Sequence, residues 1–593
     1  MKLGWLVALA ALSFSLAGPA TAEETVDIGD PITLPELKDI RYLTRAWKDL
    51  GDHEYRVLYF FGNTCPLAQR YTGVMVELEK SYAPKGVQFV AVNVSPADTI
   101  MYMAQYALDY DVTFPVLKDT RGDAARALGV TRTPEVAVLD KEGKLRYRGR
   151  VDDQFRLGGV RPKASREDLK TALDEMLGGN PVSVPLTKSE GCSLTFPSVP
   201  KPDEPVTYAE HIAPILNKHC YSCHNPEGIG PFSLDNYEKT ARRADMLAEV
   251  ISEGRMPPWY AHPEYGEFTN SRAMTYAEKL LVEQWLQGGK LEGDTAKLPP
   301  LPEVRAASEW SFEPDVVIEA KMANAIPATG FIPYRYVLLP HVFEQDTYLE
   351  AIEIKSSNPK VMHHSNLFFT PPGFAFNRSQ HFVTGTVPGG LPSIVPEGYA
   401  IMIPKGATLG LQIHYVTTGT AESDLPSVAL RYCRNPVKKR TYYNILDNSG
   451  FDVPPYHPAY EVRSEATLDD DVTLLALFGH MHLRGKDMAF IAHYPSGESE
   501  TLLSMPNYNF DWQLTYYVEP GSKTLPKGTR VECIAHFDNS AFNPYNPAPD
   551  KNVKYGEQTV DEMCQGFIFY VKNSETLDLR IDPATGWIID QQP

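Results

Sequence analysis

The stretch Tyr55-Arg56-Val57-Leu58-Tyr59-Phe60-Phe61 decides the fold of the first part of the chain, because it is almost continuously apolar and has the length of a buried strand. We expect a helix over 68–82 and a second buried strand over 87–94 directly after it. A strand over 135–139 and a helix over 166–177 complete the pattern. This alternation predicts a parallel or mixed α/β sheet for residues 33–180.

The rest of the chain has three different patterns. Residues 200–293 are rich in helical patterns and poor in strands, and a Pro-rich linker follows at 294–309. From 310 onward, short alternating segments rich in Val, Ile, Tyr and Thr are separated by Pro, Gly and Asn, which is typical of β-sandwiches. The predicted fold class is a multidomain chain with an α/β domain, a mostly-α domain and all-β sandwiches.

Composition limits the function classes. The chain has 593 residues, too many for a single core, and 43% hydrophobic with 22% charged residues indicates soluble globular domains. The net charge of −19 and the lack of a Lys/Arg-rich run exclude nucleic acid as the expected partner.

The first 22 residues are typical of a secretory signal peptide. Lys2 gives a positive start, residues 6–16 form an apolar run, and Ala20-Thr21-Ala22 gives a cleavage site. No later segment reaches about 18 uninterrupted apolar residues, so no membrane span is expected after cleavage. We therefore expect a periplasmic or secreted protein in which disulfides can form; an uncleaved membrane anchor is the alternative.

The motif Cys220-Tyr221-Ser222-Cys223-His224 is a C-x-x-C-H. Two thiols so spaced can add to the vinyl groups of a haem, and the adjacent histidine can ligate its iron. A redox dithiol or half of a zinc site is the alternative, but no second cysteine pair lies nearby and neither explains the histidine. We predict one covalent c-type haem, held by Cys220, Cys223 and His224.

The wider segment resembles a c-type cytochrome domain, with a leading helix over 208–219 and a closing helix over 274–289. Such cytochromes often take the sixth iron ligand from a Pro-rich loop, and here Met256 lies in Gly254-Arg255-Met256-Pro257-Pro258-Trp259. Met256 is therefore the predicted axial ligand. A purely structural Met256 is the alternative, and the other candidate ligands are Met246, His219 and His262.

Three histidine motifs occur in the β-rich half. They are Met362-His363-His364-Ser365, Gln412-Ile413-His414-Tyr415 and Gly479-His480-Met481-His482, and Met563 follows further along the chain. Because strand residues two apart share a face, His480 and His482 can bind one metal. Adjacent His363 and His364 face opposite ways unless a bulge or a strong twist intervenes. Imidazoles combined with a thioether favour copper, whereas zinc usually takes His with Cys or carboxylate.

On these motifs, residues 310–585 resemble the copper type II ascorbate-dependent monooxygenases, the group of peptidylglycine α-hydroxylating and dopamine β-monooxygenase. The resemblance implies two jelly-roll-like sandwiches, here 310–435 and 436–585, each holding one copper across a solvent-filled cleft. It assigns the electron-supplying copper to His363, His364 and His414, and the O₂-activating, catalytic copper to His480, His482 and Met563. It also implies a disulfide between Cys533 and Cys564.

Part of the family pattern is missing. Peptidylglycine enzymes resemble one another in an Arg two residues before the H-x-H and in an Asn and a Tyr after the ligand Met, which hold the substrate carboxylate. This chain has Phe478, Gln565 and Phe567 there. Without the Arg a carboxylate loses its charge-assisted partner, so the substitutions favour a less charged substrate.

Residues 33–180 resemble thioredoxin-like redoxins. Thr64-Cys65-Pro66 follows a strand and opens a helix, and Thr133-Pro134 lies where that fold keeps a cis-proline. Ala68 replaces the second Cys of a C-x-x-C, and the peroxiredoxin pattern fails at Leu58 and Gly62. Cys65 is a candidate redox thiol, with a structural or docking role for the domain as the alternative.

Seven cysteines leave three outside the haem motif and the family disulfide: Cys65, Cys192 and Cys433. We predict a Cys65–Cys192 disulfide that ties the redoxin to the segment leading into the cytochrome-like region. Cys433 would then be free and buried.

The sequence as a whole predicts an exported monooxygenase with two copper ions and one haem c, which hydroxylates a C–H bond with O₂. Its electrons would come from an external donor through the haem, replacing or supplementing ascorbate. The substrate is a small molecule or a peptide. Two alternatives are a non-enzymatic redox or copper carrier and a thiol-linked oxidoreductase centred on Cys65.

Overall fold

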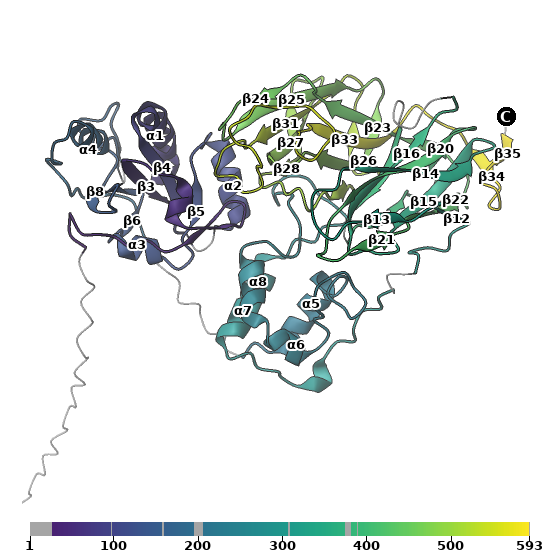
Figure 1. Cartoon of the computed structure of the whole chain (residues 1–593), viewed down its shortest axis with the longest axis horizontal. Helices are drawn as coiled ribbons and strands as arrows, with labels where there is room; N and C mark the ends of the chain where they lie inside the picture. Colours follow the sequence, from purple (N-terminus) through teal and green to yellow (C-terminus); the bar gives the residue numbers. More distant parts are fainter. Residues whose placement is uncertain are drawn as a thin grey trace, which may run out of the picture.

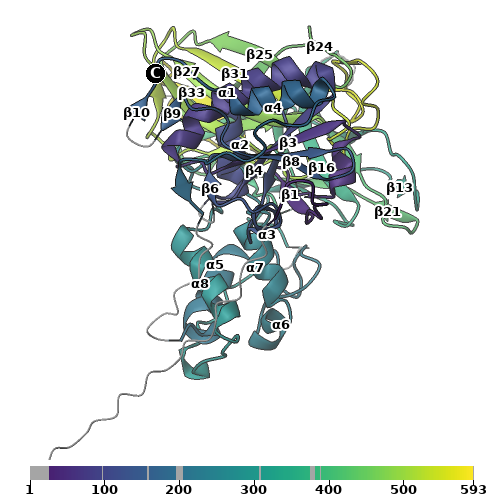
Figure 2. The ribbon, with the colours of Figure 1, turned by 90° about the vertical axis from the view of Figure 1, so that its left-hand side faces the viewer.

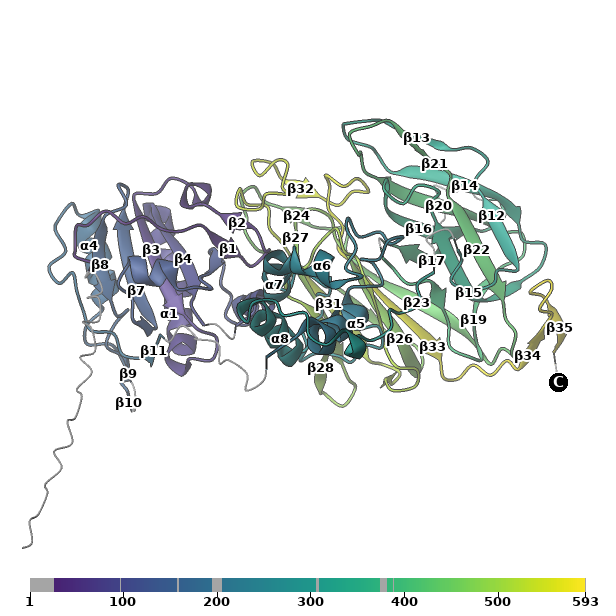
Figure 3. The same ribbon diagram turned by 90° about the horizontal axis from the view of Figure 1, so that it is seen from below.

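The computed structural model describes residues 26–95, 98–156, 159–194, 205–305, 309–373, 381–387 and 389–591. The predicted signal peptide, residues 1–22, lies outside these residues. The α/β unit lies at one end, the β-rich half at the other, and a helical unit lies below them (Figures 1 and 3). Seen from the side, the helical unit projects away from the sheets (Figure 2). Among the described helices, none combines the length and the apolar character needed to cross a membrane.

The first unit is a mixed seven-stranded sheet with the order β2-β1-β5-β4-β3-β7-β8. Its strands are β1 (Leu37–Asp39), β2 (Thr44–Arg45), β3 (Tyr55–Phe61), β4 (Val87–Asn93), β5 (Val116–Lys118), β7 (Glu135–Asp140) and β8 (Leu145–Gly149). Its helices are α1 (Pro66–Tyr82), α2 (Ile100–Asp109), α3 (Asp123–Ala127) and α4 (Asp168–Leu177). β3 runs parallel to β4 and antiparallel to β7, which confirms the predicted mixed α/β sheet.

The alternation of side chains along β3 gives this sheet two buried faces. Val57, Tyr59 and Phe61 pack with α1, α2 and α4, whereas Leu58 and Phe60 pack with α3. The unit also extends beyond the predicted limit of 180, because β11 (Cys192–Ser193) pairs antiparallel with β6 (Arg132–Thr133). Cys192 therefore belongs to the α/β unit rather than to a segment of the helical unit.

The helical unit packs around the fully buried Trp285. The helix predicted over 208–219 begins as a π-helical turn (Tyr208–Ile212) and continues as α5 (Ala213–His219). The helices α6 (Tyr237–Ala241), α7 (Ala244–Ser252) and α8 (Tyr276–Gln287) follow. Thr275 begins α8 with a reciprocal capping box to Glu278. A short 3-10 turn (Thr295–Lys297) leads into the Pro-rich stretch, which has no regular structure as far as residue 305.

The β-rich half is built from one long sheet and two four-stranded sheets. The long sheet runs β12-β22-β15-β19-β23-β33-β26-β29, with β18 beside β15 and β30 beside β26. Its strands are β12 (Val316–Glu319), β15 (Thr347–Lys355), β18 (Ser393–Ile394), β19 (Tyr399–Ile403), β22 (Ser427–Tyr432), β23 (Lys439–Asp447), β26 (Val472–His480), β29 (Thr515–Tyr517), β30 (Thr524–Leu525) and β33 (Gln565–Lys572).

The four-stranded sheets cover the two halves of the long sheet. One has the order β14 (Arg335–Val342), β20 (Thr408–Tyr415), β16 (Met362–Thr370) and β17 (His381–Thr386); the other has β25 (Tyr460–Thr467), β31 (Arg530–Phe537), β27 (Gly485–His493) and β28 (Ser499–Met505). Separate apolar cores lie inside the two resulting sandwiches.

The two sandwiches are not independent pairs of sheets divided at residue 435. β19 of the first pairs in parallel with β23 of the second, so a single sheet runs through both. The hairpin of β34 (Leu579–Ile581) and β35 (Ile588–Gln591) returns to the first sandwich, where Leu579 packs with Tyr348 and Cys433. The predicted limit of 585 for the second sandwich is therefore wrong in this respect, because these last strands bury their apolar side chains against the first.

Candidate functional site

The first histidine group lies on two neighbouring strands. His364 of β16 stands opposite His414 of β20, and the register of this pair shifts between Met362 and His364. This irregularity is the bulge that the adjacent histidines require, and it turns His363 towards the same side. One ring nitrogen from each of His363, His364 and His414 lies within 4.8 Å of the others. The structure thus brings together the three residues predicted to bind the first copper.

Two of these imidazoles, those of His364 and His414, are held neutral by their surroundings. Burial and the neighbouring histidines lower the pKa of His364 well below its usual value, and burial lowers the pKa of His414 to about 4. Nδ1 of His414 is buried and has no hydrogen-bond partner. A neutral ring with an unpaired buried nitrogen can accept a metal ion without first losing a proton.

The second group is the H-x-H at the end of β26. The ring centroids of His480 and His482 lie 5.1 Å apart. Nδ1 of His480 lies 2.6 Å from Oε1 of Gln513, and Nδ1 of His482 lies 3.1 Å from the carbonyl oxygen of Asp561. Nε2 of His482 is buried without a partner, and burial lowers the pKa of this residue to about 3. Hydrogen bonds on one ring nitrogen orient the other towards a shared metal.

The segment that carries Met563 is tied to this group. The fully buried Glu562 accepts hydrogen bonds from the backbone N–H of His482 at 2.9 Å and of Arg484 at 2.6 Å. Burial raises the pKa of Glu562 to about 8, against the opposing effect of these two bonds. Met563, which is half-buried, follows Glu562 directly, so its backbone is tied to the H-x-H segment by these contacts.

Cys564 follows Met563 and contacts Cys533 of β31. Both side chains are fully buried, and a hydrogen bond joins their two thiol groups. Both are thiols in this structure, so the disulfide implied by the family resemblance stays a prediction. Their contact does join the two sheets of the second sandwich beside the predicted copper ligand.

One aromatic side chain lies between the two histidine groups. The ring centroid of Phe510 is 5.6 Å from that of His363, 5.9 Å from that of His364, 5.8 Å from that of His414 and 6.2 Å from that of His482. The next residue, Asp511, places Oδ1 3.2 Å from Nε2 of His363. The solvent-filled cleft that the resemblance implied is therefore occupied at this point by Phe510, because the connection between β28 and β29 reaches across to the first sandwich.

The C-x-x-C-H motif begins directly after α5. Nδ1 of His224 lies 3.0 Å from the carbonyl oxygen of Phe232, which leaves Nε2 as the ligand atom. Cys223 lies against the first sandwich, since a Cβ placed on Gly389 would be 3.1 Å from its sulfur. A haem held through Cys220, Cys223 and His224 stays a prediction.

The candidate axial ligands have different surroundings. Met256 is half-buried in the loop after α7, where its N–H donates to the carbonyl of Val250. Nε2 of His219 is engaged by Glu278 at 3.0 Å, and Met246 is exposed. His262 is buried outside the helical core, where its ring meets Tyr102 of α2. Met256 remains the predicted ligand.

The remaining cysteines meet in the α/β unit. Cys65 begins α1 at its N-cap, and its sulfur lies 3.0 Å from that of Cys192 and 3.3 Å from the carbonyl oxygen of Thr133. The Thr133–Pro134 bond is cis. Burial raises the pKa of Cys65, but hydrogen bonds from Cys192 and its other neighbours outweigh this and lower it overall, whereas burial and Cys65 raise that of Cys192 to about 11. Cys433 is buried, and its state as a free thiol stays a prediction.

Sequence reasoning missed the residues that support the ligands. Phe510, Asp511, Gln513 and Glu562 belong to no motif, and their partners lie between 28 and 148 residues away in the chain. Nothing in the local sequence signals such contacts.

Comparison with known proteins identifies one part of the chain. Residues 45–161 match the family model for Redoxin. Thiol-disulfide oxidoreductase ResA of Bacillus thuringiensis subsp. konkukian is 28% identical over 144 residues, and ResA of Geobacillus kaustophilus is 29% identical over 151; each match covers 24% of this chain and 80% of the relative. A crystal structure of an uncharacterized conserved protein from Geobacillus kaustophilus shares 29% identity over 31% of this chain and 99% of that chain, with a TM-score of 0.28. The chain thus contains a redoxin domain of thioredoxin-like fold.

Proposed function

We propose that the chain is a copper-dependent monooxygenase that inserts one atom of O₂ into a C–H bond and receives electrons through its own haem. The observation that carries this proposal is the pair of histidine groups facing each other across Phe510, each with a buried ring nitrogen that has no partner. When bound, the two copper ions would supply the one-electron chemistry that activates O₂.

The chain's own residues would hold and orient these ions. His363, His364 and His414 would bind the first copper, and His480, His482 and Met563 the second. Gln513 and the carbonyl of Asp561 fix the rings of the H-x-H, and Asp511 fixes the ring of His363. Phe510 excludes water from the space between the groups. A carrier that only stores or delivers copper has no need of two such oriented sites.

The position of the helical unit supports electron supply from a haem. A cavity of about 650 Å³ between the helical unit and the first sandwich is lined by Ile229, His363, His364, Gly389 and Gly390. Cys223 lies against Gly389 at its edge. When bound, the haem would carry single electrons from an external donor, with ascorbate as an additional candidate reductant. We propose that the protein lies in the periplasm or outside the cell, because the predicted signal peptide and haem attachment to C-x-x-C-H both indicate export.

The first test is the content of copper and haem per polypeptide, on protein exported with the haem-attachment machinery present. We expect about two copper ions and one haem, because the two groups and the C-x-x-C-H are separate sites. Met563→Ala should lose or weaken one copper only, whereas Met322→Ala, at a residue that is 79% exposed, should keep both. One haem without tightly held copper, even after reconstitution, would leave a redoxin–cytochrome carrier as the function.

The redoxin domain supports a second function, thiol–disulfide exchange at Cys65 and Cys192. The 3.0 Å contact between their sulfurs makes them a candidate disulfide in the absence of a C-x-x-C. Cys192 is exposed and Cys65 is 4% exposed, so an external thiolate would attack the sulfur of Cys192. Cys65 would leave as a thiolate, and a second external thiol would then resolve the mixed disulfide. In total, one protein disulfide and two external thiols are converted into a protein dithiol and one external disulfide.

Thiol counting tests this second function. Protein oxidised in air should gain alkylatable thiols at both Cys65 and Cys192 on treatment with dithiothreitol, as located by peptide mapping. This gain should be lost in Cys65→Ser and in Cys192→Ser and kept in Cys433→Ser. We expect this because the pair is close and neither sulfur has another cysteine within reach among the described residues. Finding Cys65 alkylated in the oxidised wild-type protein would rule the pairing out.

A further inference from the structure

We infer that the substrate is a small, uncharged, largely apolar molecule, bound in a cavity between the two sandwiches that the helical unit closes on one side. This inference rests on the proposed monooxygenase function, and it assigns to that site a substrate class. The cavity has a volume of about 240 Å³, below the range of roughly 300–1,000 Å³ common for drug-sized ligands. A molecule of about one ring fits it better than a peptide does.

The cavity adjoins the first histidine group. His364 lines it, and so does Gln513, whose side chain contacts His480 of the second group. His480, His482 and Met563 themselves are not among the described residues that line it. A molecule inside it therefore lies beside one predicted ligand of the first metal and reaches the second group only through Gln513.

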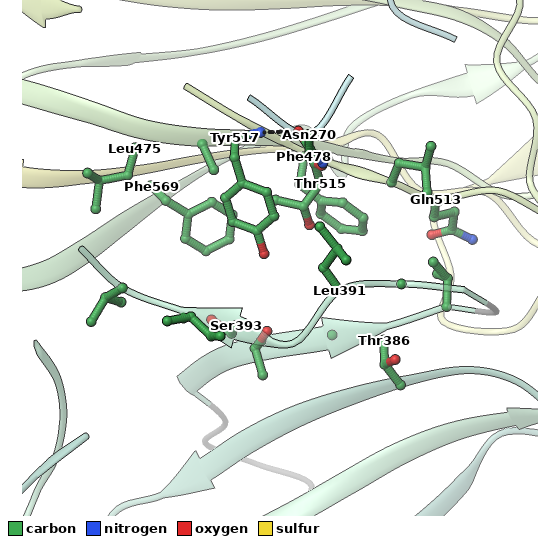
Figure 4. A pocket seen from close by; sticks show the side chains of 18 of the residues that line it. Asn270, Thr386, Leu391, Ser393, Leu475, Phe478, Gln513, Thr515, Tyr517 and Phe569 are labelled. Atoms are coloured by element: carbon green, nitrogen blue, oxygen red, sulfur yellow. Dashed lines mark hydrogen bonds between the residues drawn. The ribbon is translucent and has the colours of Figure 1, made fainter. Parts of the chain in front are cut away.

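The side chains that line the cavity indicate the chemical class of the substrate. In Figure 4, Phe478, Phe569 and Leu475 come from the second sandwich, and Leu391 faces them from the first. Among the described residues that line the cavity there is no Asp, Glu or Lys. The one fixed charge is that of Arg272, and its guanidinium already donates to the carbonyl of Gly389. A cationic substrate would lose its hydration without gaining a counter-charge, which is unfavourable. An anionic substrate would meet only this guanidinium, which is already engaged with Gly389.

Two hydroxyl groups offer polar contacts. Tyr517 and Ser393 point into the space between the walls in Figure 4. Burial raises the pKa of Tyr517 to about 12, so this hydroxyl stays protonated and can donate or accept a hydrogen bond. One hydroxyl or carbonyl on an otherwise apolar substrate would meet these groups.

The segment 259–272 of the helical unit forms one wall. The side-chain amide of Asn270 donates to the carbonyl of Thr515 at 2.7 Å and accepts from the N–H of Tyr517 at 3.0 Å. The N–H of Thr269 donates to the carbonyl of Tyr517 at 2.8 Å, which extends the pairing along the edge of β29. The indole of Trp259 packs against Tyr516, with ring centroids 4.9 Å apart. The helical unit therefore contributes to substrate selection.

Phe478 is the position that decides charge preference. It lies two residues before His480, where the peptidylglycine enzymes resemble one another in carrying an Arg. Its ring lines the cavity and stacks near Phe567 at a centroid distance of 5.5 Å. An apolar ring at this position removes the cation that a carboxylate would need.

Binding without turnover tests the inference. Three probes share a phenol ring and differ in charge: 4-ethylphenol is neutral, tyramine is a cation and 3-(4-hydroxyphenyl)propionate is an anion. Equilibrium dialysis against the copper- and haem-loaded protein, without oxygen, should show 4-ethylphenol binding at least about tenfold more tightly than either charged probe. Equal or tighter binding of a charged probe would overturn the inference.

Substitutions in the cavity wall test whether the probes bind there. Leu391→Trp should fill the cavity and weaken 4-ethylphenol binding about tenfold or more, whereas Leu338→Trp, at an exposed leucine of β14, should leave it unchanged. Phe478→Arg should reverse the preference in favour of the anion. If 4-ethylphenol binds but oxygen is never consumed, the monooxygenase proposal fails and the cavity assignment stands. If oxygen is consumed with substrate while Leu391→Trp and Phe478→Arg bind the probes as wild type does, the cavity assignment fails instead.

Discussion

Replacing His414 by alanine is expected to empty the first copper site and to lower oxygen consumption by the reduced protein more than about 100-fold. His414 is one of three imidazoles whose ring nitrogens all lie within 4.8 Å of one another among the described residues, and the carboxylate of Asp511 lies 3.2 Å from Nε2 of His363 without joining this cluster. Two imidazoles alone make a weak site for copper. The second copper should stay, because its ligands lie on other strands. Metal analysis and the electron paramagnetic resonance of the oxidised protein would show one copper per chain.

The matched control is His381→Ala. His381 lies on the neighbouring strand β17, is exposed, and stacks on Phe369 rather than on the ligand rings. It should keep both coppers and full oxygen consumption. Two tightly bound coppers in His414→Ala would contradict the assignment of this residue as a ligand.

Replacing Glu562 by leucine is expected to destabilise the second sandwich by about 3–5 kcal/mol. The carboxylate is fully buried and accepts from the N–H groups of His482 and Arg484, and Nη1 of Arg484 lies 3.9 Å from it. The substitution leaves two buried N–H groups without an acceptor. Urea unfolding followed by tryptophan fluorescence would measure the change.

Glu519→Leu provides the comparison, since Glu519 is exposed in the same sandwich. It should change the free energy of unfolding by less than about 0.5 kcal/mol. A Glu562→Leu protein as stable as Glu519→Leu would show that the buried carboxylate does not hold the H-x-H segment.

The sequence was informative where structure depends on near neighbours. The strand over Tyr55–Phe61 has the predicted bounds, and the helix predicted over 68–82 begins two residues earlier because Pro66 is favoured at a first helical position. Strand periodicity also indicated that His480 and His482 share a face. The grouping of His363, His364 and His414 came instead from the family resemblance, because adjacent strand residues ordinarily face opposite ways.

The rest depends on contacts between distant segments. The bulge beside His363 comes from how β16 pairs with β20, and no residue at 361–364 demands it. Phe510 and Asp511 reach the first sandwich from a connection in the second, and Asn270 joins the helical unit to β29. The position of Cys192 differed from the prediction for the same reason, because its two-residue strand is defined only by its partner at Thr133.

The wall that Asn270 and Trp259 build has a consequence for dissecting this protein. The chain is divided into a redoxin unit, a helical unit and a β-rich half. Residues from two of these parts nevertheless line the same cavity. A β-rich fragment produced alone would expose the edge of β29 and leave the cavity open to solvent. If the helical unit supplies electrons as we propose, exchanging it for that of another protein would alter ligand choice and electron supply together.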